Sequence, residues 1–137
     1  MNRLRIVLGF VAGAVLIASS GAHAFLGWPA VRLLLYRAQV PNDLLGGILV
    51  VWQFGGVAML TFGCIVLWLF TNLINGRQVS LLPAMLIGLA YVAFGAWALA
   101  MGGMSPFFLL FIIPGLLLVA ASALPVPRTP RSAPSAV

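Results

Sequence analysis

The stretch that decides the fold is LLGGILVVWQFGGVAMLTFGCIVLWLF, residues 44–70. It contains no Asp, Glu, Lys or Arg. A helix needs about 20 mostly apolar residues to cross the hydrocarbon core of a bilayer, and this run is longer than that. The run therefore predicts a transmembrane helix.

Three further runs without charged residues flank this stretch, at residues 6–26, 79–101 and 106–124. The whole chain is 64% hydrophobic and 6% charged, with a mean hydropathy of +1.20. Soluble domains are roughly 45–50% apolar and 25% charged, and a chain of 137 residues cannot bury so much apolar surface in a core of its own. We therefore expect an all-α integral membrane protein, a four-helix transmembrane bundle in contact with the lipid bilayer.

The first run has a second interpretation, a cleaved signal peptide. Arg3 and Arg5 precede the apolar stretch, and residues 22–24, Ala-His-Ala, match a small-residue cleavage site. Residues 25–26 extend the apolar stretch beyond that site, and small residues at helical spacing suit close helix packing. The retained helix is favoured. Cleavage after Ala24, which would leave three spans, stays open.

The connection between the first two spans predicts a short helix over residues 29–38 at the outer membrane surface. Pro29 suits a first helical position, and apolar residues recur at helical spacing along one face. Arg32 and Arg37 fall mostly on the other face, where they reach lipid phosphates. Residues 125–137 are rich in Pro, Arg, Ser and Ala, which predicts a disordered tail.

The arginines indicate the orientation of the chain. Five of them belong to the side of both termini, and two belong to the opposite side. The first group is Arg3, Arg5, Arg77, Arg128 and Arg131, and the second is Arg32 and Arg37. The positive-inside rule then predicts cytoplasmic N- and C-termini. The absence of Lys and the abundance of Ala, Gly and Pro hint at a GC-rich bacterial genome, hence at the bacterial inner membrane. Scattered arginines of this kind do not predict nucleic-acid binding.

Few side chains can carry chemistry. Outside Arg and Tyr, the titratable groups are His23, Asp43 and Cys64. A metal site needs three or four ligands, and a glycosidase needs two carboxylates. We therefore expect no metal, no cofactor and no enzymatic activity.

One polar constellation is nevertheless conceivable at the outer end of the bundle. His23 ends the first span and Asp43 begins the second, while Arg32 and Arg37 lie between them in sequence. If His23 and Asp43 meet, the carboxylate favours the charged imidazole and the site responds near neutral pH. The alternative is that His23 is an interfacial polar residue and that Asp43, or its neighbour Asn42, caps the second span.

Gln53 follows Asp43 by ten residues, roughly 15 Å along a helix, and so falls near mid-membrane. Its amide must find a partner in a neighbouring helix, in a second copy of the chain or in a polar substrate. Glycines recur every seven residues in two spans, and these stripes are predicted to face other helices. They are Gly56 and Gly63 in the second span, and Gly88, Gly95 and Gly102 in the third.

Two functions remain in view. The first is a non-catalytic accessory or structural subunit that forms a homo-oligomer or joins a larger membrane-protein partner through its glycine stripes. The alternative is a small transporter or channel with a pathway near Gln53 and an outer vestibule at His23 and Asp43. Small multidrug exporters, which this chain resembles in size, rely on a membrane-embedded acid, and none of the four runs contains one.

Overall fold

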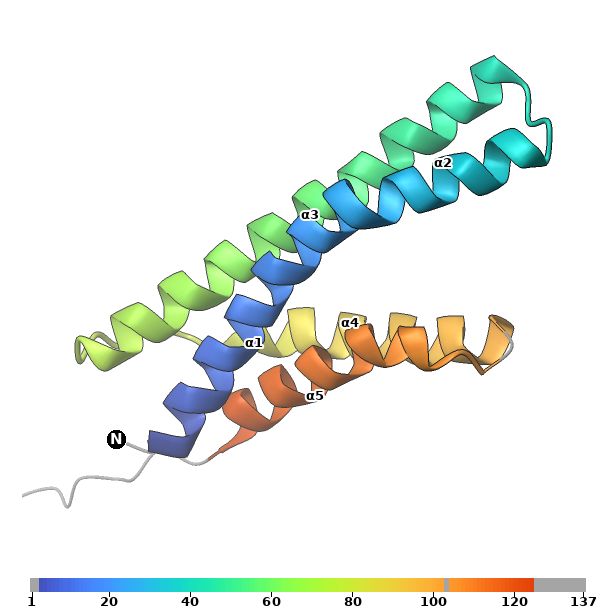
Figure 1. The fold of residues 1–137 in the computed structure, drawn as a ribbon. Helices are drawn as coiled ribbons and strands as arrows, with labels where there is room; N and C mark the ends of the chain where they lie inside the picture. The colour runs from blue at the N-terminus through green and yellow to red at the C-terminus, as the bar shows by residue number, and fades with distance from the viewer. Residues whose placement is uncertain (1–2, 103, 125–137) are drawn as a thin grey trace, which may run out of the picture.

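The computed structural model describes residues 3–102 and 104–124, and it is helical almost throughout this part of the chain (Figure 1). Helix α1 (Arg3–Ala22) leads through a π-helical turn η1 (His23–Gly27) into α2 (Trp28–Arg37). Helices α3 (Asn42–Ile74) and α4 (Leu82–Met101) follow. A 3₁₀ turn η2 (Pro106–Phe108) then opens α5 (Leu109–Ala123).

Four of the helical segments are long and apolar enough to cross a membrane. They are Arg3–Arg37, Asn42–Ile74, Leu82–Met101 and Pro106–Ala123. The predicted all-α class is thus confirmed for the described residues, and so is the presence of four helices long and apolar enough to span a membrane. The tail predicted over 125–137 lies outside them.

The first two helices differ from the prediction because no break separates the first span from the helix expected over 29–38. Pro29 lacks an N–H and its ring obstructs a regular α-helix. The chain accommodates it with a π turn, in which the Trp28 N–H bonds to the carbonyl of His23, five residues back. The result is one continuous helical segment of 35 residues, Arg3–Arg37.

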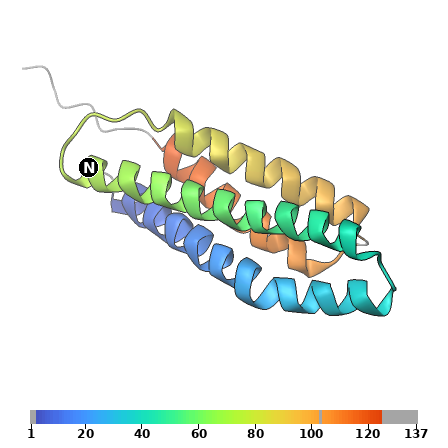
Figure 2. The ribbon, with the colours of Figure 1, turned by 90° about the horizontal axis from the view of Figure 1, so that it is seen from above.

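The helices form two antiparallel hairpins of unequal length. The long hairpin pairs α1 and α2 with α3, and the short one pairs α4 with α5 (Figure 2). At a rise of 1.5 Å per residue, the 33 residues of α3 extend about 50 Å and the 20 residues of α4 about 30 Å. Helix α3 is therefore about 20 Å longer than α4, and it extends beyond the start of α4 at the α3–α4 loop (Figure 2).

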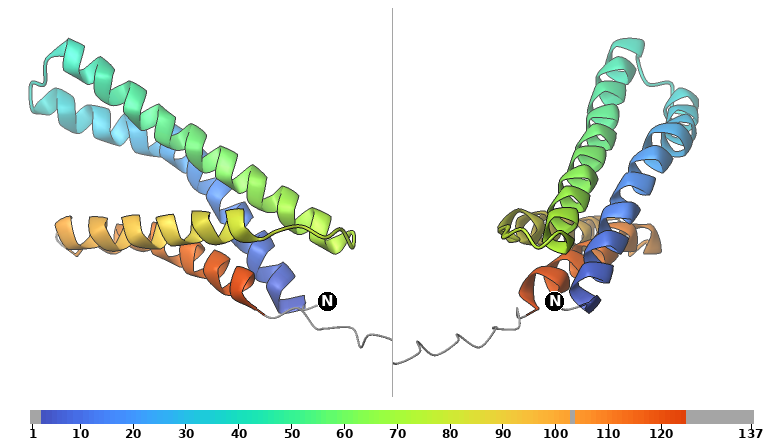
Figure 3. Two further views of the ribbon diagram at one scale, coloured as in Figure 1. Left: turned by 180° about the vertical axis from the view of Figure 1, so that it is seen from behind. Right: turned by 90° about the vertical axis from the view of Figure 1, so that its left-hand side faces the viewer.

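The two hairpins lie close together at the end that holds residue 3 and diverge towards the other end (Figure 3). The buried core lies near the closed end, where α1 packs against both α3 and α5. Its largest fully buried side chains are Phe70, Leu16, Leu118 and Val66, together with Pro114. The molecule is thus a wedge whose core holds its narrow end shut.

Glycine allows the close contacts within each hairpin. A Cβ atom built on Gly88 would lie 2.8 Å from the carbonyl oxygen of Gly115, and one on Gly115 would lie 2.8 Å from that of Gly88. In the long hairpin, a Cβ atom on Gly63 would lie 3.1 Å from the carbonyl oxygen of Gly13. The other striped glycines, at 56, 95 and 102, also face neighbouring helices or turns. The prediction that the glycine stripes pack against other helices is confirmed.

Candidate functional site

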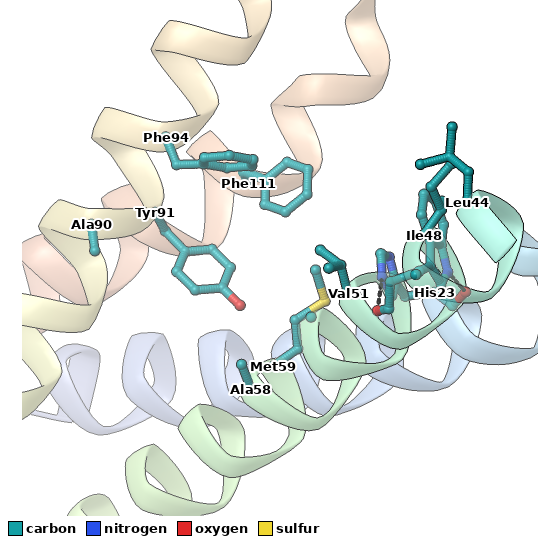
Figure 4. Close-up of a pocket in the computed structure, with 13 residues that line it drawn as sticks. His23, Leu44, Ile48, Val51, Ala58, Met59, Ala90, Tyr91, Phe94 and Phe111 are labelled. Atoms are coloured by element: carbon teal, nitrogen blue, oxygen red, sulfur yellow. Dashed lines mark hydrogen bonds between the residues drawn. The ribbon is translucent and has the colours of Figure 1, made fainter. Parts of the chain in front are cut away.

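A cleft opens where the two hairpins diverge (Figure 4). One hollow, of about 780 Å³, lies between α3 and α4. A second, of about 650 Å³, lies between α1–α2 and the start of the η2–α5 segment. The two hollows share five lining residues, which are His23, Trp52, Met59, Tyr91 and Phe111. We call the two hollows together the inter-hairpin cleft.

The walls of the inter-hairpin cleft are mostly apolar and, on the side of the short hairpin, aromatic. The rings of Phe94 and Phe111 meet edge to face with centroids 5.1 Å apart, and Tyr91 lies 6.0 Å from Phe111. Tyr91 extends from α4 towards α3 across the cleft (Figure 4). Its hydroxyl makes no hydrogen bond to the residues that the structure describes. It is therefore a polar group that a bound molecule can reach.

The opposite wall holds a reciprocal pair, His23 and Trp52. The Nε2 atom of His23 lies 2.9 Å from the carbonyl oxygen of Trp52, and Trp52 Nε1 donates to the carbonyl oxygen of His23 over 2.9 Å. The two rings stack with centroids 4.2 Å apart and planes 4° from parallel. Because a carbonyl only accepts, Nε2 of His23 carries a proton. This pair joins η1 to α3.

Small residues around the pair let η1 and α3 approach each other. A Cβ atom on Gly55 would lie 3.3 Å from Nε2 of His23, and one on Gly27 would lie 2.8 Å from the Trp52 ring. One turn before His23, the hydroxyl of Ser20 donates to the carbonyl oxygen of Gly56 over 2.8 Å. His23 therefore acts as a structural polar residue that pairs η1 with α3.

The structure does not bring His23 and Asp43 together. Asp43 is exposed in the first turn of α3, whereas His23 bonds to Trp52 further along that helix. No side chain caps α3, whose N-cap residue is Pro41, so the capping predicted for Asn42 or Asp43 is wrong. The carboxylate still lies at a helix N-terminus, where the helix dipole favours a negative charge.

Arg32 and Arg37 lie on α2, and both are exposed. Arg32 lines a small surface hollow with Trp28 and Tyr36, apart from the inter-hairpin cleft. Gln53 is half-buried on α3, beside Trp52 in sequence, and it does not line the cleft. Its amide makes no hydrogen bond within residues 3–102 and 104–124. Of the residues predicted for the vestibule and the pathway, only His23 lines the cleft, and the lining does not include Asp43, Arg32, Arg37 or Gln53.

The cleft contains no metal-binding set: in the described part of the chain no three His, Cys, Asp or Glu side chains come together. The residues that do shape the cleft were not singled out from the sequence, with the exception of His23. Trp52 carried a usable signal, since an indole N–H in the middle of an apolar span must find an acceptor. Tyr91 and Phe111 carried none, because aromatic residues are common in apolar helices.

Comparison of this chain with protein-family models, with curated proteins and with solved structures found no match.

Proposed function

We propose that this chain is a non-catalytic accessory subunit of a membrane protein complex, and that the inter-hairpin cleft receives one transmembrane helix of a partner protein. The observation that carries the proposal is an open glycine on the cleft wall. Gly47 of α3 lines the cleft, and a Cβ atom built on it would meet nothing within 4 Å.

Most helical glycines of this fold mark a helix contact. At Gly13, Gly63 and Gly88, among others, a Cβ atom would lie within about 3 Å of a neighbouring helix. Glycine in a helix costs about 1 kcal/mol relative to alanine, and close backbone approach offsets that cost in membranes. Gly46 and Gly47 have no such neighbour in the chain itself, and neither does Gly21. A partner helix would supply one at Gly47.

A helix suits the cleft better than a lipid chain does. An acyl chain gains nothing from a missing Cβ atom, whereas a helix gains close backbone contact. The opposite wall offers the rings of Phe94 and Phe111 for packing and the hydroxyl of Tyr91 for one hydrogen bond. A polar side chain on the partner helix would match that hydroxyl.

The cellular setting that goes with this proposal is the bacterial inner membrane, with both termini in the cytoplasm, as the arginine distribution favours. The cleft then opens towards the periplasmic half of the bilayer. A second copy of the chain is the competing occupant, and mass determination of the cross-linked complex separates the two. The transport alternative has less support, because the cleft walls are apolar and Gln53 lies outside them.

The proposal is tested by paired substitutions on α3. Gly47→Leu fills the open space on the cleft wall, and Gly46→Leu adds the same side chain at the adjacent position, which does not line the cleft. We expect Gly47→Leu to lose the partner on native purification and Gly46→Leu to keep it. Equal retention by both variants would show that the cleft does not hold the partner.

A photo-cross-linking residue identifies the occupant directly. Placed at Ala90, which lines the cleft, it should react with a transmembrane peptide of another chain, and placed at Ala96, an exposed position of α4 outside the cleft, it should not. Cross-links to lipid alone at position 90 would contradict the proposal. Solute flux through liposomes that contain only this chain, blocked by Gly47→Leu, would favour transport instead.

A further inference from the structure

A separate cavity, of about 400 Å³, lies at the closed end of the wedge, opposite to the inter-hairpin cleft. The segments that line it are the start of α1, the end of α3, the loop to α4, the first turn of α4 and the end of α5. Its walls are largely apolar, with Leu73, Leu82 and Met85 among them, and its polar lining comes from Arg5 and Ser122.

Arg5 is a buried cation, with 7% of its surface exposed. Its Nε donates to the carbonyl oxygen of Ala121 over 2.9 Å, and its Nη2 donates to those of Ser122, over 3.2 Å, and Leu124. These carbonyls end α5 and lack partners within their own helix. The guanidinium has five N–H groups. The two on Nη1 have no hydrogen bond to the residues that the structure describes.

The hydroxyl of Ser122 is the second unsatisfied group at this cavity. Its Oγ atom is buried and has no hydrogen-bond partner among the described residues. A buried hydroxyl without a partner is unfavourable, because it has lost its hydrogen bonds to water. Ser122 and Arg5 both line the cavity, so an acceptor group bound there would lie beside both residues.

The chain has no acidic side chain that can balance Arg5. Its one acid, Asp43, lies exposed in the first turn of α3, while the closed end holds the last turn of that 33-residue helix. The carbonyl end of α5 offers only about half an elementary charge. Arg77 adds further positive charge, since it lines a neighbouring hollow and bonds to the Oδ1 atom of Asn72 over 2.9 Å. An uncompensated buried charge is unfavourable, and no acidic side chain of the described residues lies near Arg5, so an anionic group of another molecule would stabilise it.

We infer that this cavity binds the phosphate group of an anionic phospholipid, with the Nη1 donors of Arg5 and the hydroxyl of Ser122 as its ligands. Arginine and a hydroxyl are well matched to phosphate oxygens. Inorganic phosphate offers the same oxygens, but it gains nothing from apolar walls such as those formed by Leu73, Leu82 and Met85. The glycerol backbone and acyl chains of a lipid would cover these walls.

The experiment uses the full chain, delipidated in detergent, and native mass spectrometry to count retained lipid. Three probes are compared: phosphatidylglycerol, a diacylglycerol with the same acyl chains and no phosphate, and inorganic phosphate. We expect one tightly held phosphatidylglycerol, no retained diacylglycerol, and no displacement of the lipid by millimolar phosphate. Equal retention of diacylglycerol overturns the phosphate site, and displacement by inorganic phosphate overturns its assignment to a lipid.

Three variants locate the bound lipid. Arg5→Gln should weaken retention of phosphatidylglycerol by about tenfold or more, because it removes the charge and the guanidinium donors. Arg3→Gln is the matched control, since it removes the same charge at an exposed position of the same helix end, and it should retain lipid as the wild type does. Equal loss in both variants would mean general attraction to a basic surface and would overturn the site.

Arg5→Gln also removes the hydrogen bonds that end α5, so loss of lipid in this variant can reflect a local change of fold. Ser122→Ala avoids this difficulty because it leaves Arg5 and its carbonyl partners intact. We expect it to weaken retention by about threefold to tenfold through the loss of one hydrogen bond. Unchanged retention in Ser122→Ala contradicts the proposed ligand set.

Discussion

His23 and Trp52 are joined twice, because each side chain bonds to the backbone carbonyl of the other residue and their rings stack. His23→Ala and Trp52→Phe should therefore each cost about 1 kcal/mol, because each removes one side-chain hydrogen bond to a backbone carbonyl of the neighbouring segment. The measurement is the free energy of unfolding in detergent–lipid micelles.

Thr61→Val is a suitable control for these two substitutions. The Thr61 hydroxyl is exposed and donates to the Val57 carbonyl of its own helix, over 2.9 Å. Its loss should change the free energy of unfolding by less than about 0.5 kcal/mol. If neither His23→Ala nor Trp52→Phe costs more than this control, the pair does not hold η1 against α3 in the folded protein.

Asp43 should be energetically independent of His23. Its carboxylate is exposed in the first turn of α3. Asp43→Asn should cost less than about 0.5 kcal/mol, and its effect should add to that of His23→Ala within about 0.3–0.5 kcal/mol. The same unfolding assay checks both values. A larger coupling would restore the pH-responsive site that the sequence suggested as one interpretation.

The partner of His23 could not be predicted from the sequence, although His23 itself was found. A pairing between helices depends on their register, and the π turn at η1 shifts that register by widening one turn of the helix. The need of a polar group near mid-span for a hydrogen-bond partner was predicted for Gln53, one residue away from Trp52. The indole N–H of Trp52 has the same need for an acceptor, and it donates to the carbonyl oxygen of His23.

Helix boundaries were predictable wherever composition changes sharply. The predicted span over 79–101 ends where α4 ends, because glycines follow it. The predicted break near Pro29 did not form. A proline removes one N–H, and a neighbouring π turn accommodates the loss without ending the helix. Sequence patterns show where a helix is weakened, while the packing of η1 against Trp52 decides whether it stops.

The α4–α5 hairpin depends on the contact of Gly88 with Gly115. In Gly115→Ala the new Cβ atom would lie 2.8 Å from the Gly88 carbonyl oxygen and 2.9 Å from the Val92 nitrogen. The helices must then move apart, at a cost of about 1–3 kcal/mol. Gly46→Ala is the matched control, because its Cβ atom meets nothing within 4 Å, and it should be neutral or stabilising. Thermal unfolding compares the two variants, and equal effects would contradict the close approach.

At the scale of the whole molecule, the proposed insertion of all four apolar helices in a membrane would place the tip of the long hairpin and the α3–α4 loop on opposite sides of it. In a Cys64→Ser background, Tyr36→Cys and Gln78→Cys, both at exposed positions, should react with a membrane-impermeant maleimide from opposite faces of sealed vesicles. Labelling of both positions from the same face would rule out this arrangement. The assay also decides whether the termini are cytoplasmic.

The number of helices long and apolar enough to span a membrane followed from composition alone, because each long uncharged run formed one such helix. The wedge did not. The angle between the hairpins depends on which side chains fill the closed end, and burial of Phe70 and Leu16 there is a property of the packed helices. The placement of the aromatic residues around Phe111 in the cleft also depends on the angle between the hairpins. Arg5 was assigned only to orientation and to the signal-peptide interpretation, since nothing in the sequence places it against the end of α5.

The lateral opening of the wedge changes how an occupant of the inter-hairpin cleft is supplied. In the proposed setting the cleft faces lipid, so a ligand arrives by diffusion within the bilayer and never as an aqueous solute. Its occupancy then follows its mole fraction in the membrane. Diluting the protein in buffer would leave binding unchanged, whereas adding lipid at constant protein would titrate the occupant away.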